Sequence, residues 1–383
     1  MNKIAVVTAT RAEYGLLSPV VHELRKYEGD DMRIDLIVTG THLSVQYGET
    51  IKEIDERIDH QINISVKSDT ELDISANQAE TLVKFTELFV KECYSAVILL
   101  GDRYETLAIA IAAGNTRTPI FHLCGGDTTE GAIDEWIRHS VTKISYLHFA
   151  TTEESRRRII QMGEDPSRVY NFGSTSIDNI LRVANMSKQE ALTSIGMQMC
   201  QYAICTYHPV TLETENVDLQ MKEFLEAIKA FPTIQFVVTK SNSDQGGARI
   251  NELLDIAERE IPNIHVFASL GIRRYLSLMK HAEFVLGNSS SGIIEAPALK
   301  VPTINIGDRQ RGRLQCESVI NCGSKGKDIC NAIDLAMSKE FKQICMNVVN
   351  PYGDGHAAAR IAEKAIAVVR EGKIDLKKHF FDL

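Results

Sequence analysis

Carboxylic acids gather at the ends of two apolar runs in the first half of the chain. Asp102 closes "AVILLGD" (96–102), and "HLCGGDTTEGAIDE" (122–135) carries Asp127, Glu130 and Asp134 at the end of another run. Carboxyl groups near apolar walls and near one another acquire shifted pKa values, which suits general acid–base catalysis. Any one of these acids alone is better explained as a helix-start residue. The cluster, together with His208 after "YAICTY" (202–207), favours a catalytic site.

A second chemical signal is "GNSSSGIIEAPALK" (287–300), in which small hydroxyl residues separate an apolar run from a helical pattern. This pattern is typical of a helix N-terminus, whose free backbone N–H groups and dipole attract an anion such as phosphate. Ser289, Ser290 and Gly292 would let a phosphate approach closely. Glu295 could accept hydrogen bonds from ribose hydroxyls. The alternative is a serine-capped helix with a carboxylate that only complements the helix dipole.

Arginines also follow several apolar runs. They are Arg11 in "TATRAEYG" (8–15), Arg103 in "GDRYE" (101–105), and Arg309 and Arg313 in "GDRQRGR" (307–313). A guanidinium fork suits a diphosphate, so several arginines at strand ends are a specific signal in an acidic chain. "TATRAEYG" lacks the G-x-G-x-x-G fingerprint, and the G-x-x-x-x-G-K-[ST] motif is absent from the sequence. The phosphate site is therefore predicted in the second half of the chain.

Alternating strand and helix patterns must position these residues. Apolar, β-branched runs occur at 3–9, 33–40, 96–102, 118–123, 146–151, 202–209, 234–241, 263–270, 284–290 and 301–307. With helical patterns between them, they predict an α/β fold of two doubly wound, Rossmann-like domains facing across a cleft. The expected domains are an N-terminal catalytic domain at 1–175, a C-terminal anion-binding domain at 190–357 and a terminal segment at 358–383. Ligands of such sheets bind at the carboxyl ends of the strands.

Composition excludes several classes of function. The net charge of −9 over 383 residues argues against a nucleic-acid partner, which needs a basic surface. No apolar run approaches the ~20 residues of a membrane span, and the N-terminus has the pattern of a strand rather than a signal peptide. A cytoplasmic location with no membrane partner is expected. The eight cysteines form no C-x-x-C pair, so reduced thiols and no metal site are predicted. For Cys124 a packed thiol is favoured over a nucleophile, because no histidine is placed as its base.

Taken together, the motifs resemble those of the hydrolysing UDP-N-acetylglucosamine 2-epimerases, the bacterial enzymes that begin sialic-acid and legionaminic-acid synthesis. The resemblance covers nearly the whole chain, in order. It rests on "TATRAEYG", "VTGTHL…YGETIKEI", "LLGDRYE", "GGDTTEGAIDEWIRHS", "YHP", "GNSSSGIIEAP" and "NIGDRQRGR". It implies the two-domain GT-B fold, with a helix at 358–372 that crosses back to the first domain. It also implies a UDP-N-acetylhexosamine ligand, no cofactor, and a homo-oligomer, either a dimer or a tetramer.

The resemblance further implies roles for individual residues. The positions that hold UDP in the family are matched by Arg11, Arg103, Asn242, Leu270, Ser289, Ser290, Glu295 and Arg309. Within this set, the two serines would meet the diphosphate, the glutamate would take the ribose, and the backbone near Leu270 would meet the uracil. The positions implicated in catalysis are matched by Asp102, Asp134 and His208.

One turn departs from the family pattern. Family members often carry glutamates on both sides of the Gly-Gly pair, where this chain has Cys124 and Asp127. Asp127 or Glu130 is therefore the expected replacement carboxylate. The implied reaction converts UDP-GlcNAc and water to ManNAc and UDP. It would proceed by anti elimination of UDP to 2-acetamidoglucal and then hydration, with His208 assisting UDP departure or holding the diphosphate.

Four alternatives remain open at this point. The same motifs fit a hydrolysing epimerase that acts on a UDP-2,4-diacetamido-2,4,6-trideoxyhexose in legionaminic-acid synthesis. They also fit a non-hydrolysing epimerase, which would release UDP-ManNAc. A GT-B glycosyltransferase needs the same UDP site, although the dense acid cluster argues against it. A nucleotide-sugar-binding regulator without turnover is favoured only by Cys124.

Overall fold

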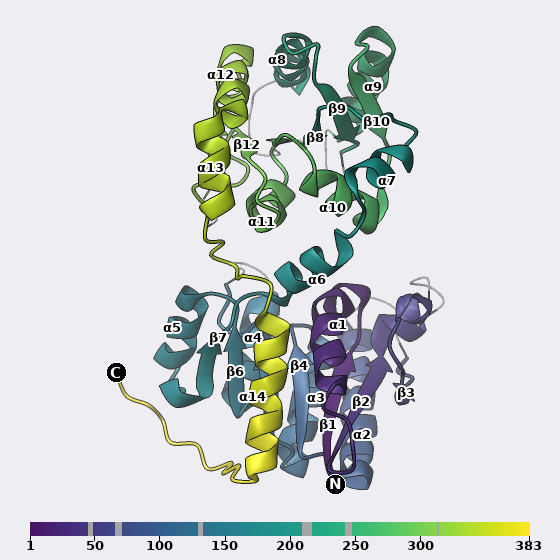
Figure 1. Ribbon diagram of the computed structural model, residues 1–383. Coiled ribbons are helices and arrows are strands. Elements are labelled where there is room, and N and C mark those ends of the chain that lie inside the picture. The colour runs from purple at the N-terminus through teal and green to yellow at the C-terminus, as the bar shows by residue number, and fades with distance from the viewer. Residues whose placement is uncertain (45–48, 66–70, 129–132, 209–216, 242–246, 312–313) are drawn as a thin grey trace. The chain divides into compact units, whose positions relative to one another are not determined.

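The computed structural model describes residues 1–44, 49–65, 71–128, 133–208, 217–241, 247–311 and 314–383 (Figure 1). The chain divides into two compact units. Unit 1 comprises Met1–Asn179 and Gly355–Leu383, and unit 2 comprises Ile180–Asp354. The chain therefore passes between the units twice, first within helix α6 (Thr175–Val183) and again just before helix α14 (Ala357–Glu371).

Unit 1 is built on a seven-stranded parallel sheet. In sheet order the strands are β3 (His60–Ile62), β2 (Met32–Thr39), β1 (Asn2–Thr8), β4 (Ala96–Leu100), β5 (Ile120–Leu123), β6 (Leu147–Ala150) and β7 (Val169–Asn171). The order reverses between β1 and β4, which makes their carboxyl ends the topological switch point where ligands of doubly wound sheets bind. The helices that accompany α6 and α14 in this unit are α1 (Arg11–Arg25), α2 (Glu71–Glu92), α3 (Tyr104–Thr116), α4 (Ile133–Ile144) and α5 (Glu153–Gln161).

Helices cover both faces of this sheet. Helices α1 and α14 pack together on one face, where Leu17 and Ala362 belong to the same buried apolar cluster (Figure 1). Helices α2, α3 and α4 pack on the other face through residues such as Phe85 and Val141. Because both faces are covered, β1 is buried from Ile4 onward, and its sequence is almost continuously apolar.

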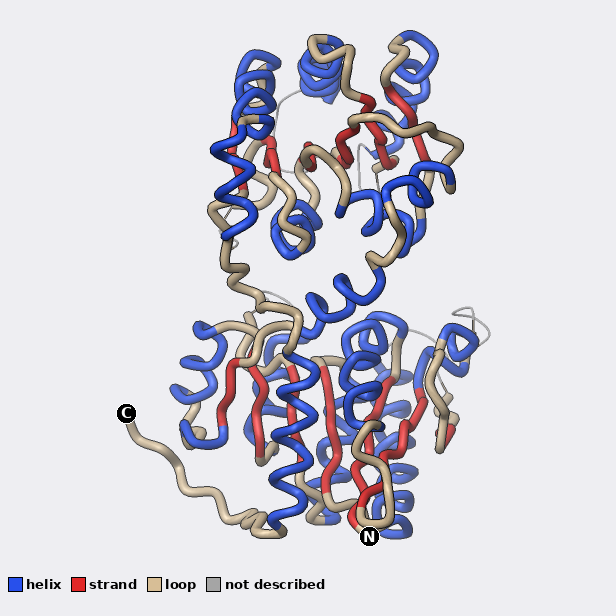
Figure 2. Tube along the Cα trace, in the orientation of Figure 1, coloured by secondary structure: helices blue, strands red, loops and turns tan. Residues whose placement is uncertain are grey.

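Unit 2 is built on a six-stranded parallel sheet. Figure 2 shows its strands in red with blue helices around them. In sheet order the strands are β10 (Ile264–Phe267), β9 (Gln235–Thr239), β8 (Tyr202–Thr206), β11 (Val285–Gly287), β12 (Thr303–Ile306) and β13 (Val319–Cys322). Its switch point lies between β8 and β11. Its helices are α7 (Lys188–Thr193), α8 (Val217–Lys229), α9 (Gly247–Glu260), α10 (Gly271–Lys280), α11 (Ser290–Ala298), α12 (Gly326–Met337) and α13 (Lys339–Asn347).

These two strand orders confirm the predicted fold class, an α/β protein with two doubly wound parallel sheets. Each sheet has the order 3-2-1-4-5-6 of a Rossmann-like domain, and the first has one further strand. Within the described ranges, no helix has both the length and the apolar character needed to cross a membrane.

Candidate active site

Strand β1 leads directly into helix α1 at the switch point of unit 1. Thr10 is the N-cap, and its side chain accepts a hydrogen bond from the Glu13 backbone N–H at 3.3 Å. The Glu13 carboxylate in return accepts bonds from the backbone N–H groups of Ala9 and Thr10 at 2.8 and 3.1 Å. This capping box starts the helix immediately after the strand. It places the backbone of Arg11 at the switch point, and the Arg11 side chain lies outside the described part of the structure.

Asp102 follows β4 at the same switch point and pairs with Arg138 of helix α4. A guanidinium nitrogen of Arg138, Nη2, donates to Asp102 Oδ2. A second nitrogen, Nη1, donates to the backbone carbonyl of Asp127 at 2.8 Å. The Arg138 side chain is only 6% exposed, whereas that of Asp102 is 28% exposed. One buried guanidinium therefore joins the loop after β4 to the loop after β5 and leaves part of the Asp102 carboxylate open to solvent.

The Asp127 carboxylate is held by two hydroxyl groups. Ser155 Oγ donates to Asp127 Oδ1 at 2.5 Å, and Thr151 Oγ1 donates to the same oxygen at 3.0 Å. Both donors follow β6, at the start of helix α5. The preceding Gly126 has a φ of +80°, and a Cβ there would lie 2.3 Å from the Ser155 carbonyl oxygen. Glycine is thus required for this turn to approach α5, and the approach anchors the Asp127 side chain.

Cys124 lies among the same charged groups. It has a φ of +61°, which is rare for a residue with a side chain, and its backbone N–H donates to the Phe149 carbonyl at 3.0 Å. Burial raises the pKa of the Cys124 thiol to about 12, and the carboxylates of Asp127 and Asp102 add to the effect. A neutral thiol therefore lies beside the carboxylates of Asp102 and Asp127 at neutral pH.

We expect Cys124 to be chemically inert at neutral pH. Its thiolate fraction rises only as the pH approaches about 12, so at pH 7.5 iodoacetamide should modify it more slowly than the exposed Cys93. Because a protonated thiol is a weak nucleophile, Cys124→Ala should keep turnover within about tenfold of the wild type. Mass spectrometry of the alkylated protein and steady-state kinetics measure these two quantities. Rapid labelling of Cys124 with loss of turnover would instead support a nucleophile.

The other charged candidates of unit 1 are Asp134, Glu130 and Arg103. Asp134 lies exposed in the first turn of α4, one turn before Arg138. Glu130 lies outside the described residues. Arg103 is the N-cap of α3, and its Nε donates to the fully buried Glu105 carboxylate at 3.3 Å. This bond holds the Arg103 side chain at the start of α3 and leaves 38% of it exposed.

In unit 2, helix α11 begins directly after β11. Ser289 is its N-cap, and the Ser289 hydroxyl accepts from the Ser291 backbone N–H at 3.4 Å. Ser290 is the first helical residue and is partly exposed. Gly292 is buried, and a Cβ there would lie 2.8 Å from Thr303 Cγ2 on β12. Glycine at this position therefore lets α11 pack closely on the sheet, with its N-terminus at the switch point.

Glu295 adds a shielded carboxylate beside this helix start. Its Oε2 is inaccessible to solvent and has no hydrogen-bond partner among the described residues. Burial raises the pKa of Glu295 above its ordinary 4.5. Tyr275 of α10 lies close by, and its pKa rises to about 12 because of burial and, to a lesser degree, the Glu295 carboxylate. Leu270 is buried at the N-cap of α10, where its carbonyl accepts from Arg274 Nε at 2.7 Å.

His208 and Arg309 approach the same switch point from β8 and β12. His208 Nδ1 lies 3.2 Å from Ser241 Oγ, which follows β9. Arg309 Nη1 donates to the backbone carbonyl of Asn288 at 3.1 Å, immediately before the Ser289 N-cap. The structure thus brings together His208, Ser289 and Arg309 within unit 2. Asn242 and Arg313 lie outside the described residues.

Arg138 is the main site residue that strand-end reasoning does not predict. It lies in the second turn of a helix rather than after a strand. The available signal is an arginine on the apolar stripe of α4, next to Ile137 and three residues before Val141, which are both buried. A charge on such a stripe is buried only when it has a partner, and Asp102 is that partner.

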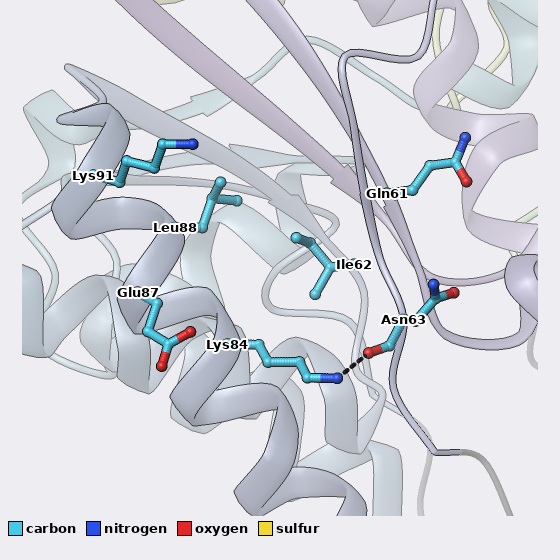
Figure 3. Close-up of a pocket in the computed structure, with 7 residues that line it drawn as sticks. All are labelled: Gln61, Ile62, Asn63, Lys84, Glu87, Leu88 and Lys91. Carbon is cyan, nitrogen blue, oxygen red and sulfur yellow. Dashed lines mark hydrogen bonds between the residues drawn. The ribbon is translucent and has the colours of Figure 1, made fainter.

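Two other features of unit 1 lie apart from the predicted site residues. A pocket of about 370 Å³ between β3 and α2 is lined by Gln61, Ile62, Asn63, Lys84, Glu87, Leu88 and Lys91 (Figure 3). Lys84 Nζ donates across it to the Asn63 carbonyl at 2.5 Å. In the part of the chain that the structure describes, Asp35, His60 and Glu92 are the one trio spaced for a metal ion. Arg33 and Lys3 already pair with its two carboxylates at 2.6 and 3.0 Å.

Comparison with known proteins gives consistent matches over the chain. The family model described as UDP-N-acetylglucosamine 2-epimerase matches residues 23–365. The chain is 38% identical to the GDP/UDP-N,N'-diacetylbacillosamine 2-epimerase (hydrolyzing) of Campylobacter jejuni over 346 residues, 89% of each chain. It is 37% identical to polysialic acid biosynthesis protein P7 of Escherichia coli, with 100% of this chain and 98% of that protein covered.

A crystal structure of UDP-GlcNAc 2-epimerase from Neisseria meningitidis bound to UDP-GlcNAc superposes with a TM-score of 0.80. The superposition covers 95% of this chain and 100% of that chain, at 21% identity. This similarity shows a shared GT-B-like α/β fold.

Proposed function

The chain belongs to the UDP-N-acetylglucosamine 2-epimerase family, and from this premise we propose that it is a hydrolysing 2-epimerase of UDP-N-acetylhexosamines. The proposed reaction converts UDP-GlcNAc and water to ManNAc and UDP through 2-acetamidoglucal. It would be the first step of a sialic-acid-type synthesis. The names of the Campylobacter jejuni and Escherichia coli relatives support the hydrolysing reaction and the pathway, respectively.

The observation that carries this proposal is the Asp102–Arg138 pair at the switch point of unit 1. The C2 proton of the sugar is not acidic, because no carbonyl is attached to C2. Its removal needs a positioned carboxylate and an early break of the C1–O bond. The partly exposed Asp102 carboxylate, oriented by a buried guanidinium, is suited to that role, and Asp134 one turn from Arg138 is the proposed second acid–base group.

Unit 2 supports the nucleotide part of the proposal. The N-terminus of α11, with Ser289 and Ser290, supplies N–H and hydroxyl donors for the departing diphosphate. Arg309, placed beside Asn288, contributes a positive charge to the same group. The shielded Oε2 of Glu295 is an acceptor suited to ribose hydroxyls. We assign His208 to the diphosphate or to proton donation as UDP leaves.

Proton NMR of the UDP-GlcNAc reaction in D₂O tests the proposed function. We expect free ManNAc that carries solvent deuterium at C2, together with UDP. That result requires both C2 proton removal and hydrolysis. UDP-ManNAc as the product would indicate a non-hydrolysing epimerase, and a product without deuterium at C2 would contradict the elimination mechanism.

A second substrate is favoured by one specific observation. The Campylobacter jejuni relative, at 38% identity, is named for diacetylbacillosamine rather than for N-acetylglucosamine. A UDP-2,4-diacetamido-2,4,6-trideoxyhexose is therefore the alternative substrate of the same proposed reaction. Comparison of kcat/KM on the two nucleotide sugars decides between them, since specificity is the ratio of these values.

A further inference from the structure

Asn288 occupies the position between β11 and the N-cap of α11, and its side chain is fully buried. Its amide makes two hydrogen bonds to the backbone of one other residue, His208. Asn288 Oδ1 accepts from the His208 N–H at 2.7 Å, and Asn288 Nδ2 donates to the His208 carbonyl at 2.8 Å. The two bonds together fix the amide orientation, because the N–H can only donate and the carbonyl can only accept.

Backbone hydrogen bonds connect Asn288 to the end of β8 and to the loop after β12. Its N–H donates to the Thr206 carbonyl at 3.2 Å, at the end of β8. Its carbonyl accepts from Arg309 Nη1 at 3.1 Å and from Gln310 Nε2 at 2.8 Å, after β12. This close arrangement depends on the preceding Gly287, whose φ is +139° and where a Cβ would lie 2.0 Å from the Thr206 carbonyl oxygen.

We propose that Asn288 is a positioning residue that holds His208 in register with the start of α11, through the two hydrogen bonds of its side chain. This inference rests on the proposed function, in which His208 acts on the departing UDP. An asparagine is required because the site needs one donor and one acceptor on a single planar group. An ionised aspartate offers only acceptors, and one of its oxygens would face the His208 carbonyl.

The side chain of Asn288 contacts His208, and its backbone carbonyl contacts Arg309 and Gln310. A substitution can therefore remove the first set of contacts and keep the second. Asn288→Ala removes the His208 contacts but keeps the backbone carbonyl that Arg309 and Gln310 use. We expect kcat to fall about 10²-fold, as for a small misplacement of a reacting group, while KM changes by less than about threefold. A general loss of folding would also lower the apparent kcat at unchanged KM, so kcat is expressed per folded molecule, with the folded fraction and melting temperature of each variant measured by circular dichroism.

Asn288→Asp provides the conservative variant. When protonated, its carboxyl group can again donate to the His208 carbonyl and accept from the His208 N–H. Burial should raise the pKa of the introduced carboxyl group. We therefore expect the kcat of Asn288→Asp, relative to the wild type, to recover as the pH is lowered from 8 to 6, and that of Asn288→Ala to show no such recovery.

Asn305→Ala is the matched control. Asn305 is a buried amide on β12, and its Nδ2 donates to Asn321 Oδ1 at 2.8 Å. This variant loses the hydrogen bond between Asn305 and Asn321 but keeps both bonds between Asn288 and His208. Its kcat should therefore stay within about twofold of the wild type. Asn288→Ala with kcat within threefold of the wild type would overturn the proposal. So would equal losses in Asn288→Ala and Asn305→Ala.

A readout independent of turnover separates this inference from the proposed function. The His208 imidazole can be followed by NMR in protein with labelled histidine and assigned with His208→Gln. Its ring resonances should move in Asn288→Ala, because the ring shifts relative to Ser241, and remain unchanged in Asn305→Ala. If the wild type turns over no UDP-N-acetylhexosamine, the proposed function fails, and these resonances still decide whether Asn288 positions His208.

Discussion

Asp102→Asn is expected to lower kcat for the proposed UDP-GlcNAc hydrolysis by about 10³-fold, the range typical for loss of a general base or acid. The amide cannot accept the C2 proton. It also removes the carboxylate charge that pairs with the Arg138 guanidinium, which is 6% exposed. The rate at which C2-deuterated ManNAc appears should fall with kcat, because C2 proton removal precedes deuterium addition, and each ManNAc that forms should still carry deuterium at C2. Steady-state kinetics with NMR detection in D₂O measures both quantities.

Two controls accompany the Asp102 variant. Asp30→Asn removes an exposed carboxylate of the same unit and should leave kcat within about twofold, as is usual for surface substitutions. The UDP affinity of Asp102→Asn should stay close to that of the wild type. The proposal assigns Asp102 to the C2 proton of the sugar and assigns Ser289 and Ser290 of α11 to the diphosphate. If kcat of Asp102→Asn remains within tenfold of the wild type, Asp102 is not the base.

Glu295→Gln is expected to weaken UDP binding by about 10- to 100-fold, the worth of hydrogen bonds to a charged acceptor. The Oε2 atom of Glu295 is shielded from solvent and lacks a partner within the described residues. Ribose hydroxyls would satisfy it, and a neutral amide would accept them more weakly. Isothermal titration calorimetry with UDP measures the change. The exposed Glu260→Gln in the same unit should bind UDP as the wild type does.

The pH dependence of UDP binding gives an additional test of Glu295. Burial raises the pKa of the free carboxyl above 4.5, whereas hydrogen bonds from the ribose favour the ionised form. UDP binding should therefore release a proton. The affinity should rise as the pH rises through the free-state pKa of Glu295 and fall below it. Glu295→Gln should remove this component, and an unchanged pH profile in that variant would contradict the assignment.

The strands in the sheet interiors are those that the sequence predicts best. Runs such as 96–102 and 202–209 are apolar at nearly every position because β4 and β8 are covered on both faces. The three strands not predicted, β3, β7 and β13, each lie at a sheet edge. They have three or four residues and are partly exposed, so they carry no continuous apolar run.

The sequence predicts those residues of the candidate site that directly follow a strand. Asp102, His208 and Ser289 each follow a strand beside a switch point, which is visible from the alternation of apolar runs. The partners of these residues are not visible in the same way. Arg138 lies 36 positions from Asp102, and Asn288 lies 80 positions from His208. Such pairs depend on which strands become neighbours, and a single sequence does not encode this as a local pattern.

The position of α14 has a consequence for how the protein is made. Helix α14 covers α1 in unit 1, where Leu17, Val20 and Leu24 share an apolar cluster with Ala358 and Ile361. These three α1 side chains leave the ribosome early, and the helix that covers them emerges only after the whole of unit 2. A nascent chain can therefore complete unit 2 before unit 1, and unit 1 remains incomplete, with an apolar face uncovered, until α14 has been synthesised.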